Sequence, residues 1–413
     1  MEYTSRPSQN KSIFSTAIFG GPLNFSEALF CISLCAMFLP VKVYPAVYLL
    51  SSIIFIADGL MNNPSSLKSF SKNMWLLFLG IFTVYATLSF FIHYKGEVYL
   101  ASSFLKLLIN FLFLAASTFW LSNRNNQNLL RSSDITLLFI FLLCLAQLLY
   151  YHKAFHFHLI YGSESSGKAS TLYNKALYFW GLDDKNMFGA RLALMGFAYI
   201  LIPIIRFNRL VWWRIIFVFL LGYLSLSRTP IVALIIGVFF LIWIVSKKYT
   251  RIALVVISMS SLPFVAQKLI RIDNLMASND GMGVRITYWK AFFKHFTDIS
   301  PLGNGFLQGN KFLEQYAAFY HGEPHLHNTF MSCYLEFGVI GFLSYTLFII
   351  YFYRFCLLKN KSTFFWLAAF LPLLAIMMIL YSGYDNDIII YLTLMYLLGS
   401  IKQIDLTQIK MRI

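Results

Sequence analysis

The sequence predicts an all-α polytopic membrane protein with about twelve transmembrane helices and a large periplasmic loop that carries short amphipathic helices. Of its 413 residues, 59% are hydrophobic and only 12% are charged, which excludes an ordinary soluble domain. Long apolar runs recur along the whole chain. A bilayer core needs about 20 mostly apolar residues per helix. Outer-membrane barrels show short alternating strands instead, so these runs predict helices.

Twelve segments are apolar enough to be expected as membrane spans. They cover residues 23–40, 43–60, 74–93, 98–121, 135–151, 187–205, 210–227, 229–246, 252–270, 328–353, 364–382 and 386–402. Glu27 and Lys268 interrupt the first and the ninth of them. No cleavable signal peptide is expected, because the N-terminal segment is polar and lacks a convincing small-residue cleavage site. Residues 1–413 are therefore expected to form a single integral membrane domain.

The net charge of +16 is distributed over alternate short loops. The positive-inside rule assigns such loops to the cytoplasm, so both termini are expected there. Because these charges fix the topology and attract anionic membrane lipids, a nucleic-acid partner is not expected. The seven basic clusters are Arg6/Lys11, Lys68/Lys72, Arg124/Arg131, Arg206/Arg209/Arg214, Lys247/Lys248/Arg251, Arg354/Lys359/Lys361 and Lys402/Lys410/Arg412.

Two longer segments, 152–186 and 271–327, then lie on the opposite, periplasmic side. Long loops are uncommon in compact proteins unless they have a task. Within the second loop, residues 284–296 have apolar and aromatic side chains at helical spacing, which predicts an amphipathic helix at the membrane surface. Residues 299–309 are rich in glycine and proline, which favours a turn. The five cysteines lie in or beside apolar runs without metal-ligand spacing, so free buried thiols are expected.

Two arginines on this side have the chemistry to bind phosphate. Arg228 lies between the seventh and eighth spans, and Arg285 lies at the start of the amphipathic segment. A guanidinium keeps its proton and presents a planar fork that suits phosphate oxygens. Pro230 suits the first turn of the next helix, whose N-terminal amides also favour an anion. Each arginine also has an interpretation without a functional role: Arg228 would reach lipid phosphates, and Arg285 would lie on a solvated surface.

His327 lies where the long loop enters the tenth span, in His325-Leu-His-Asn-Thr-Phe330. An imidazole can accept the proton of a substrate hydroxyl as a general base. Asn328 would orient this imidazole or bind the substrate. Two alternatives remain: a histidine that is merely hydrogen-bonded, and a metal site with His325, joined by His156 and His158. No metal site is expected, because the sequence shows no converging ligand set.

The start of the sixth span carries a further polar group, with Asp184, Asn186 and Arg191. Helix capping is one interpretation of the first two side chains, and contact with an acceptor substrate is the other. An arginine one turn inside a span is costly in hydrocarbon, so Arg191 is expected to point into a hydrated cavity.

The order and spacing of these motifs resemble the O-antigen ligase and polymerase superfamily. His327-Asn328 is followed after nine residues by Gly338 and after two more by Gly341. Arg285 is followed four residues later by Trp289, as is the second arginine of the family. The Asp/Asn-rich element ahead of Phe188-Gly189, and the Ser300–Gly305 segment, are also similar to the family.

The resemblance implies a glycosyltransferase, an O-antigen ligase in the inner membrane of a Gram-negative bacterium, with its active site on the periplasmic face. Its donor would be an O-antigen polysaccharide on undecaprenyl diphosphate and its acceptor the lipid A–core oligosaccharide, with inversion at the anomeric carbon and no cofactor or metal. The expected catalytic residues are His327, Arg228 and Arg285. The expected substrate-binding residues are Asn328, Asp184, Asn186, Arg191 and His325.

Three alternative functions remain open from the sequence. An O-antigen polymerase and a protein O-oligosaccharyltransferase would use the same donor with other acceptors. A flippase or transporter of lipid-linked glycans is of another class, and predicts broken helices and charged residues at mid-membrane depth. Lys106 is the main candidate of that kind, whereas the other polar residues gather at one interface.

Overall fold

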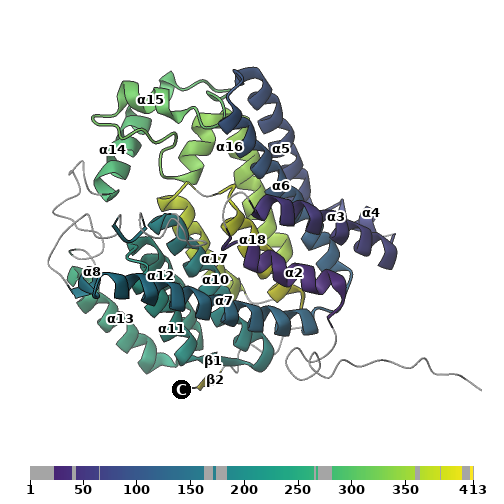
Figure 1. Ribbon diagram of the computed structural model, residues 1–413, viewed down its shortest axis with the longest axis vertical. Helices are drawn as coiled ribbons and strands as arrows, with labels where there is room; N and C mark the ends of the chain where they lie inside the picture. The colour runs from purple at the N-terminus through teal and green to yellow at the C-terminus, as the bar shows by residue number, and fades with distance from the viewer. Residues whose placement is uncertain are drawn as a thin grey trace, which may run out of the picture.

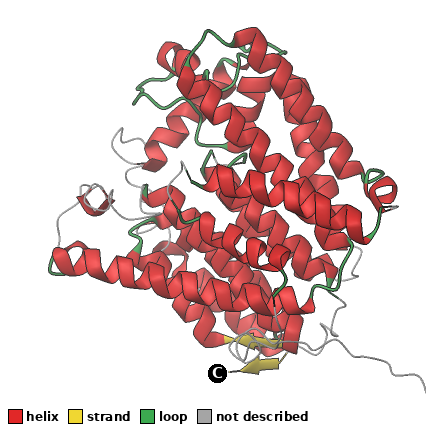
Figure 2. Cartoon of the chain, turned by 45° about the vertical axis from the view of Figure 1, so that its right-hand side comes forward, coloured by secondary structure: helices red, strands yellow, loops and turns green. Residues whose placement is uncertain are grey.

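The computed structural model describes residues 23–39, 43–64, 66–161, 171–173, 184–264, 267, 281–358, 363–381, 383–401 and 410–412. In these residues helices dominate, and the strands are a short parallel pair, β1 (Arg209–Val211) with β2 (Lys410–Arg412) (Figure 2). The basic pair Arg6/Lys11, Lys268 and the first ten residues of the 271–327 loop lie outside the described residues.

Each of the twelve predicted spans corresponds to a helix, and the all-α polytopic class is confirmed. Seven helices in the described part of the chain are long and apolar enough to cross a membrane. They are α3 (Tyr44–Asn62), α5 (Met74–His93), α6 (Val98–Ser122), α7 (Gln127–Ala154), α10 (Lys185–Phe207), α12 (Arg228–Val245) and α16 (Thr329–Phe352).

The other five helices are shorter, with 12 to 17 residues. The total of twelve spans therefore remains a prediction. These helices are α2 (Phe25–Ala36), α11 (Trp212–Leu224), α13 (Lys248–Phe264), α17 (Thr363–Ile379) and α18 (Asn386–Ser400). Among the described residues, four α-helices lie outside the predicted spans, namely α4 (Ser66–Phe70), α8 (His158–Tyr161), α14 (Gly281–Lys294) and α15 (Gly309–Tyr316).

Glu27 starts a helix and does not interrupt one. The amide of Glu27 donates to the Asn24 side chain (2.9 Å), and the Glu27 carboxylate accepts from the Asn24 amide (3.1 Å). This reciprocal capping satisfies two amides that a helix N-terminus leaves without partners. Arg124 pairs with the same carboxylate and lies 4.4 Å from the centre of the Trp120 ring. The charge that interrupts the apolar run thus sits in the first turn of α2, where it is neutralised.

Two of the basic clusters, those at 206–214 and 410–412, lie together at one end of the bundle. Arg206 and Arg214 both pair with Asp134, at 3.2 and 2.6 Å. The β1–β2 pair joins the loop before α11 to the end of the chain. In Figure 1 this pair lies at the lower edge, whereas α14 and α15 lie at the upper edge. The prediction that all the basic loops share the cytoplasmic face stays a prediction.

The sidedness of the two ends can be tested by cysteine labelling. In a background without the five native cysteines, Lys68→Cys should be protected from a membrane-impermeant reagent applied to spheroplasts. His158→Cys and Lys311→Cys should be labelled, because their exposed side chains belong to the loops predicted in the periplasm. Labelling of position 311 only after the inner membrane is permeabilised would contradict the topology and the position of the site described below.

The loop before α16 folds into a compact cap on the start of that helix. The predicted helix at 284–296 is confirmed as α14, and the segment before Gly309 is non-helical as expected. Tyr288 and Phe292 of α14 are buried in a small core that also holds Leu313 of α15 and Leu335 of α16. Phe293 of α14 and Phe296, which follows this helix, remain 66% and 42% exposed. The contact of this segment with the membrane surface stays a prediction.

A kink at Gly338 in α16 admits the Ser300–Gly305 segment. Gly338 has φ 60° and ψ −158°, a conformation open essentially to glycine alone. The Val339 amide donates to the Pro301 carbonyl (2.9 Å), and the Gly305 amide donates to the Glu336 carbonyl (3.0 Å). The backbone of a loop therefore approaches α16 closely at this glycine.

Candidate active site

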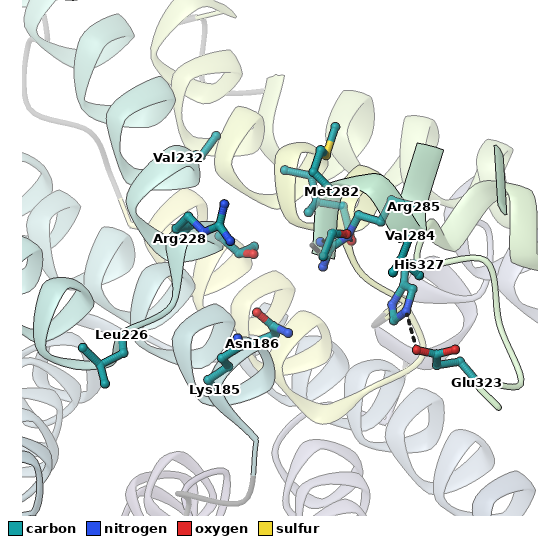
Figure 3. Close-up of a pocket in the computed structure, with 13 residues that line it drawn as sticks. Lys185, Asn186, Leu226, Arg228, Val232, Met282, Val284, Arg285, Glu323 and His327 are labelled. Carbon is teal, nitrogen blue, oxygen red and sulfur yellow. Dashed lines mark hydrogen bonds and ion pairs between the residues drawn. The ribbon is translucent and has the colours of Figure 1, made fainter. Parts of the chain in front are cut away.

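A cavity of about 400 Å³ lies among the N-terminal ends of α10, α12 and α14 and the loop that precedes α16 (Figure 3). One part of its lining is apolar, with Val232, Met282, Val284 and Ile379 among the residues. The other part is strongly polar. Its charged and hydrogen-bonding side chains are Lys185, Asn186, Arg228, Thr229, Arg285, Glu323 and His327.

Arg228 is the first residue of α12, as predicted from Pro230, which suits the first turn of a helix. The Ser227 side chain, at the N-cap position, makes no capping hydrogen bond to this helix end. The α10 end lies against it, because the Ser227 hydroxyl donates to the Asn186 amide oxygen (3.3 Å). A Cβ at Gly189 would lie 2.9 Å from the Pro230 ring, so glycine permits the two helix ends to approach this closely.

Arg285 lies in the first turns of α14 and is 8% exposed. Its Nε donates to the Ile379 carbonyl and its Nη1 to the Gly281 carbonyl, both at 2.7 Å. The guanidinium is therefore fixed in place before any ligand binds. Trp289, one turn further on, donates its indole hydrogen to the Leu326 carbonyl (3.1 Å). Helix α14 thus supplies the arginine and also holds the backbone next to His327.

His327 has a positive φ of 52°, and its Nε2 lies 3.7 Å from Oε1 of Glu323. The Tyr288 hydroxyl donates to the other carboxylate oxygen of Glu323 at 2.6 Å. The Tyr288 ring lies parallel to the imidazole, with an interplanar angle of 5°. Burial raises the pKa of Glu323, but the nearby His327 and the Tyr288 hydroxyl outweigh this effect and lower the pKa to about 2.

Asn328 lies outside the cavity lining and is fully buried. Its side-chain oxygen caps α16 by accepting from the amides of Phe330 and Met331, both at 3.0 Å, and its nitrogen donates to the Met378 carbonyl (3.1 Å). Both ends of the amide are therefore engaged within the protein. The effect is to fix the backbone directly after His327.

His325 also lies outside the lining, behind His327. Its ring stacks on Tyr381 (centroids 4.7 Å apart, 16°) and meets the edge of the His327 ring at 4.7 Å. Burial, assisted by His327, lowers the pKa of His325 to about 3, so this imidazole is neutral near pH 7. Within the described ranges, no three His, Cys, Asp or Glu side chains are grouped closely enough to hold a metal ion.

Of the remaining polar residues at the start of α10, one lines the cavity and the others lie within or cap the helix. Asn186 lines the cavity. Asp184 caps α10 by accepting from the amides of Asn186 (2.8 Å) and Met187 (2.9 Å), which is the capping alternative raised from the sequence. Arg191 lies deeper in the same helix, 4% exposed and outside the lining of the cavity. Of the five residues expected to bind substrate, Asn186 is thus the one that reaches the cavity.

The arrangement is suited to a ligand that carries more than one negative charge. Lys185, Arg228 and Arg285 bring three cationic side chains to the lining, against the single carboxylate of Glu323 among the described lining residues. Three helices begin at this cavity, and a helix N-terminus has a partial positive charge. Sequence reasoning did not assign Glu323 or Lys185, since neither belongs to a periodic pattern that marks a role.

Residues 213–346, from α11 to α16, match the model of the O-antigen ligase family. This match supports the resemblance of the segment to the O-antigen ligase/polymerase superfamily. The matched segment includes Arg228, Arg285, Glu323 and His327, while Lys185 and Asn186 of α10 lie before it. A search of curated proteins found no match to the chain.

Proposed function

We propose that this protein is an inner-membrane O-antigen ligase, a glycosyltransferase that acts on the periplasmic face. It transfers O-antigen polysaccharide from undecaprenyl diphosphate to lipid A–core oligosaccharide. One observation carries the proposal: two arginines from different helices and a histidine at the start of α16 line the same cavity. A diphosphate needs cations that hold it as it departs, and a sugar hydroxyl needs a base.

In the proposed reaction, Arg228 and Arg285 bind the diphosphate and stabilise the charge that develops as the bond between the anomeric carbon and the phosphate oxygen breaks. His327 takes the proton of the acceptor hydroxyl while its oxygen bonds to the anomeric carbon. A single displacement inverts that carbon and releases undecaprenyl diphosphate. Asn186 is proposed to contact the acceptor sugar, and Asn328 and His325 support His327 from behind. The diphosphate is already a good leaving group, so the mechanism uses no cofactor.

Deletion of the gene, followed by gel analysis of the lipopolysaccharide, tests the choice of acceptor. A ligase predicts uncapped lipid A–core together with polymer that accumulates on its lipid carrier. Core capped with a single repeat unit would indicate a polymerase instead. Unchanged lipopolysaccharide with loss of glycosylated proteins would indicate a protein O-oligosaccharyltransferase. Polymer-free lipid-linked units confined to the cytoplasmic leaflet would indicate a flippase.

Replacement of the two arginines by lysine is expected to impair transfer although the charge is kept. A guanidinium binds phosphate oxygens through a planar fork that an ammonium lacks. Loss of one preorganised charge-stabilising donor typically costs about 10²–10³-fold in rate. Arg228→Lys and Arg285→Lys should therefore each reduce initial rates of ligation by about this factor in a reconstituted assay.

Arg251→Lys is the matched control, because Arg251 of α13 donates to the Trp243 carbonyl in the last turn of α12, at the end of this helix opposite Arg228. All variants should accumulate in the membrane at comparable levels, as measured by immunoblot. Near wild-type transfer by both cavity variants would remove the role in diphosphate binding.

A further inference from the structure

Glu323 is the acidic side chain among the described residues that line the cavity, and it has no role in the mechanism proposed above. It belongs to the loop before α16 and precedes His327 by four residues. Its two carboxylate oxygens face different partners: Oε1 faces Nε2 of His327 at 3.7 Å, and Oε2 accepts the Tyr288 hydroxyl at 2.6 Å. Figure 3 shows the imidazole pointing toward this carboxylate at the edge of the cavity.

Tyr288 holds the carboxylate in place from the protein side. Its side chain is fully buried in the small core below the cap. Its hydroxyl donates to Glu323 and accepts the amide hydrogen of His321 (3.2 Å), so its position is fixed by two partners. The same aromatic ring lies parallel to the imidazole of His327. One buried side chain therefore sets the positions of both members of the pair.

We propose that Glu323 is a positioning residue for His327. Its carboxylate accepts the hydrogen on Nε2, so that the neutral imidazole keeps its lone pair on Nδ1 to receive the proton of the acceptor hydroxyl. A neutral imidazole has one donor and one acceptor nitrogen, and the bond made by one nitrogen decides the role of the other. This inference rests on the proposed function, since it assigns a tautomer to the base of that reaction.

The Glu323 carboxylate also stabilises the protonated form of His327 electrostatically. Lys185, Arg228 and Arg285 line the same cavity and would oppose the positive charge that His327 acquires when it takes a proton. His325, which meets the His327 ring edge-on, is neutral near pH 7. With its low pKa, Glu323 is ionised at any working pH and offsets those cations. A base can then operate beside the groups that bind the diphosphate.

The distance of 3.7 Å corresponds to an ion pair and is longer than a hydrogen bond. Catalytic contacts are often long without substrate and shorten in the productive complex. The two side chains are 20% and 29% exposed, so the pair retains room to close.

The test is the dependence of kcat/KM on pH for Glu323→Gln, in membranes reconstituted with lipid-linked polysaccharide and lipid A–core. The amide is nearly isosteric but does not stabilise an imidazolium. The decline of the rate at low pH should therefore move to lower pH, and the plateau should fall by about tenfold or more, though by less than the ~10²–10⁴-fold of removing the base. Glu323→Asp keeps the charge and should keep the position of the decline.

Glu314→Gln is the matched control, because Glu314 is an exposed acid of the same loop, on α15. It should leave both the rate and the pH profile unchanged. If Glu323→Gln does not accumulate, Glu323→Ala is interpreted in the same way, with thermal unfolding confirming a folded protein.

An unshifted pH profile in a folded Glu323→Gln or Glu323→Ala protein would overturn the positioning role. Failure of the proposed function would give a different result, because the wild-type protein itself would then not transfer glycan to lipid A–core at any pH. If the wild type is active and His327→Ala is inactive, an unaltered Glu323→Gln refutes only the inference about Glu323.

Discussion

Replacement of His327 by alanine should abolish most glycan transfer while leaving the protein folded and able to bind its donor. General-base catalysis typically contributes about 10²–10⁴-fold, and a loss of this size is expected in the initial rate of ligation. Binding of undecaprenyl diphosphate should survive, because Arg228 and Arg285 remain in the cavity. Donor binding can be measured as a shift in thermal unfolding temperature on addition of the lipid.

His295→Ala is the matched control for this variant. His295 lies in the same loop, at the end of α14, and pairs with Asp298 at 3.1 Å. Its replacement should not change the rate. In the wild type, transfer should decline as the pH falls, because a protonated imidazole cannot accept the hydroxyl proton. A His327→Ala protein that transfers glycan at near wild-type rates would refute the general-base mechanism.

The metal alternative makes a different forecast for the two neighbouring histidines. His325 is stacked on Tyr381 behind His327 and does not line the cavity. Under the general-base mechanism, His325→Ala should have a milder effect than His327→Ala. If both were metal ligands, both substitutions would be about equally damaging. Activity that a chelator abolishes and an added divalent ion restores would support the metal site and contradict the mechanism proposed above.

The arginines of the site could be predicted from the sequence because residue type and position alone indicate their role. An arginine at the mouth of an apolar run has few roles available, and Pro230 marked Arg228 as the start of a helix. The same reasoning anticipated α14, since helical periodicity is a local property of the chain. The sequence does not show which residues of the loop before α16 contact which helix. Glu323 reaches His327 only because Tyr288 and Trp289 hold the loop against α14.

Polar residues beside His327 illustrate a second limit of the sequence. Asn328 and Asp184 are chemically able to bind sugars, and the motif placed them next to the site. In the structure each instead satisfies the free amides of a helix N-terminus, α16 and α10 respectively. Capping and ligand binding use the same side-chain oxygens. The sequence alone therefore cannot choose between them, whereas the position of the helix start decides the matter.

The largest effect on stability is expected for Gly338→Ala. The backbone at this position has φ 60° and ψ −158°, which a residue with a side chain adopts only under strain. An added Cβ would also lie 2.0 Å from the Pro301 carbonyl oxygen and 2.6 Å from the Gly303 amide nitrogen. Both obstacles are backbone atoms, so no side-chain rotation relieves the overlap. The free energy of unfolding should fall by about 3 kcal/mol or more.

The consequence should extend to the active site, because the Ser300–Gly305 segment and the start of α16 are hydrogen-bonded across the kink. The Asn304 amide donates to the Leu335 carbonyl (2.8 Å), two turns from His327. Thermal unfolding of the detergent-purified protein and its abundance in the membrane measure the effect. Gly80→Ala in α5 is the control, since a Cβ there meets no atom within 4 Å and alanine favours a helix. Equal unfolding temperatures for the two variants would show that the loop does not enter α16 at this glycine.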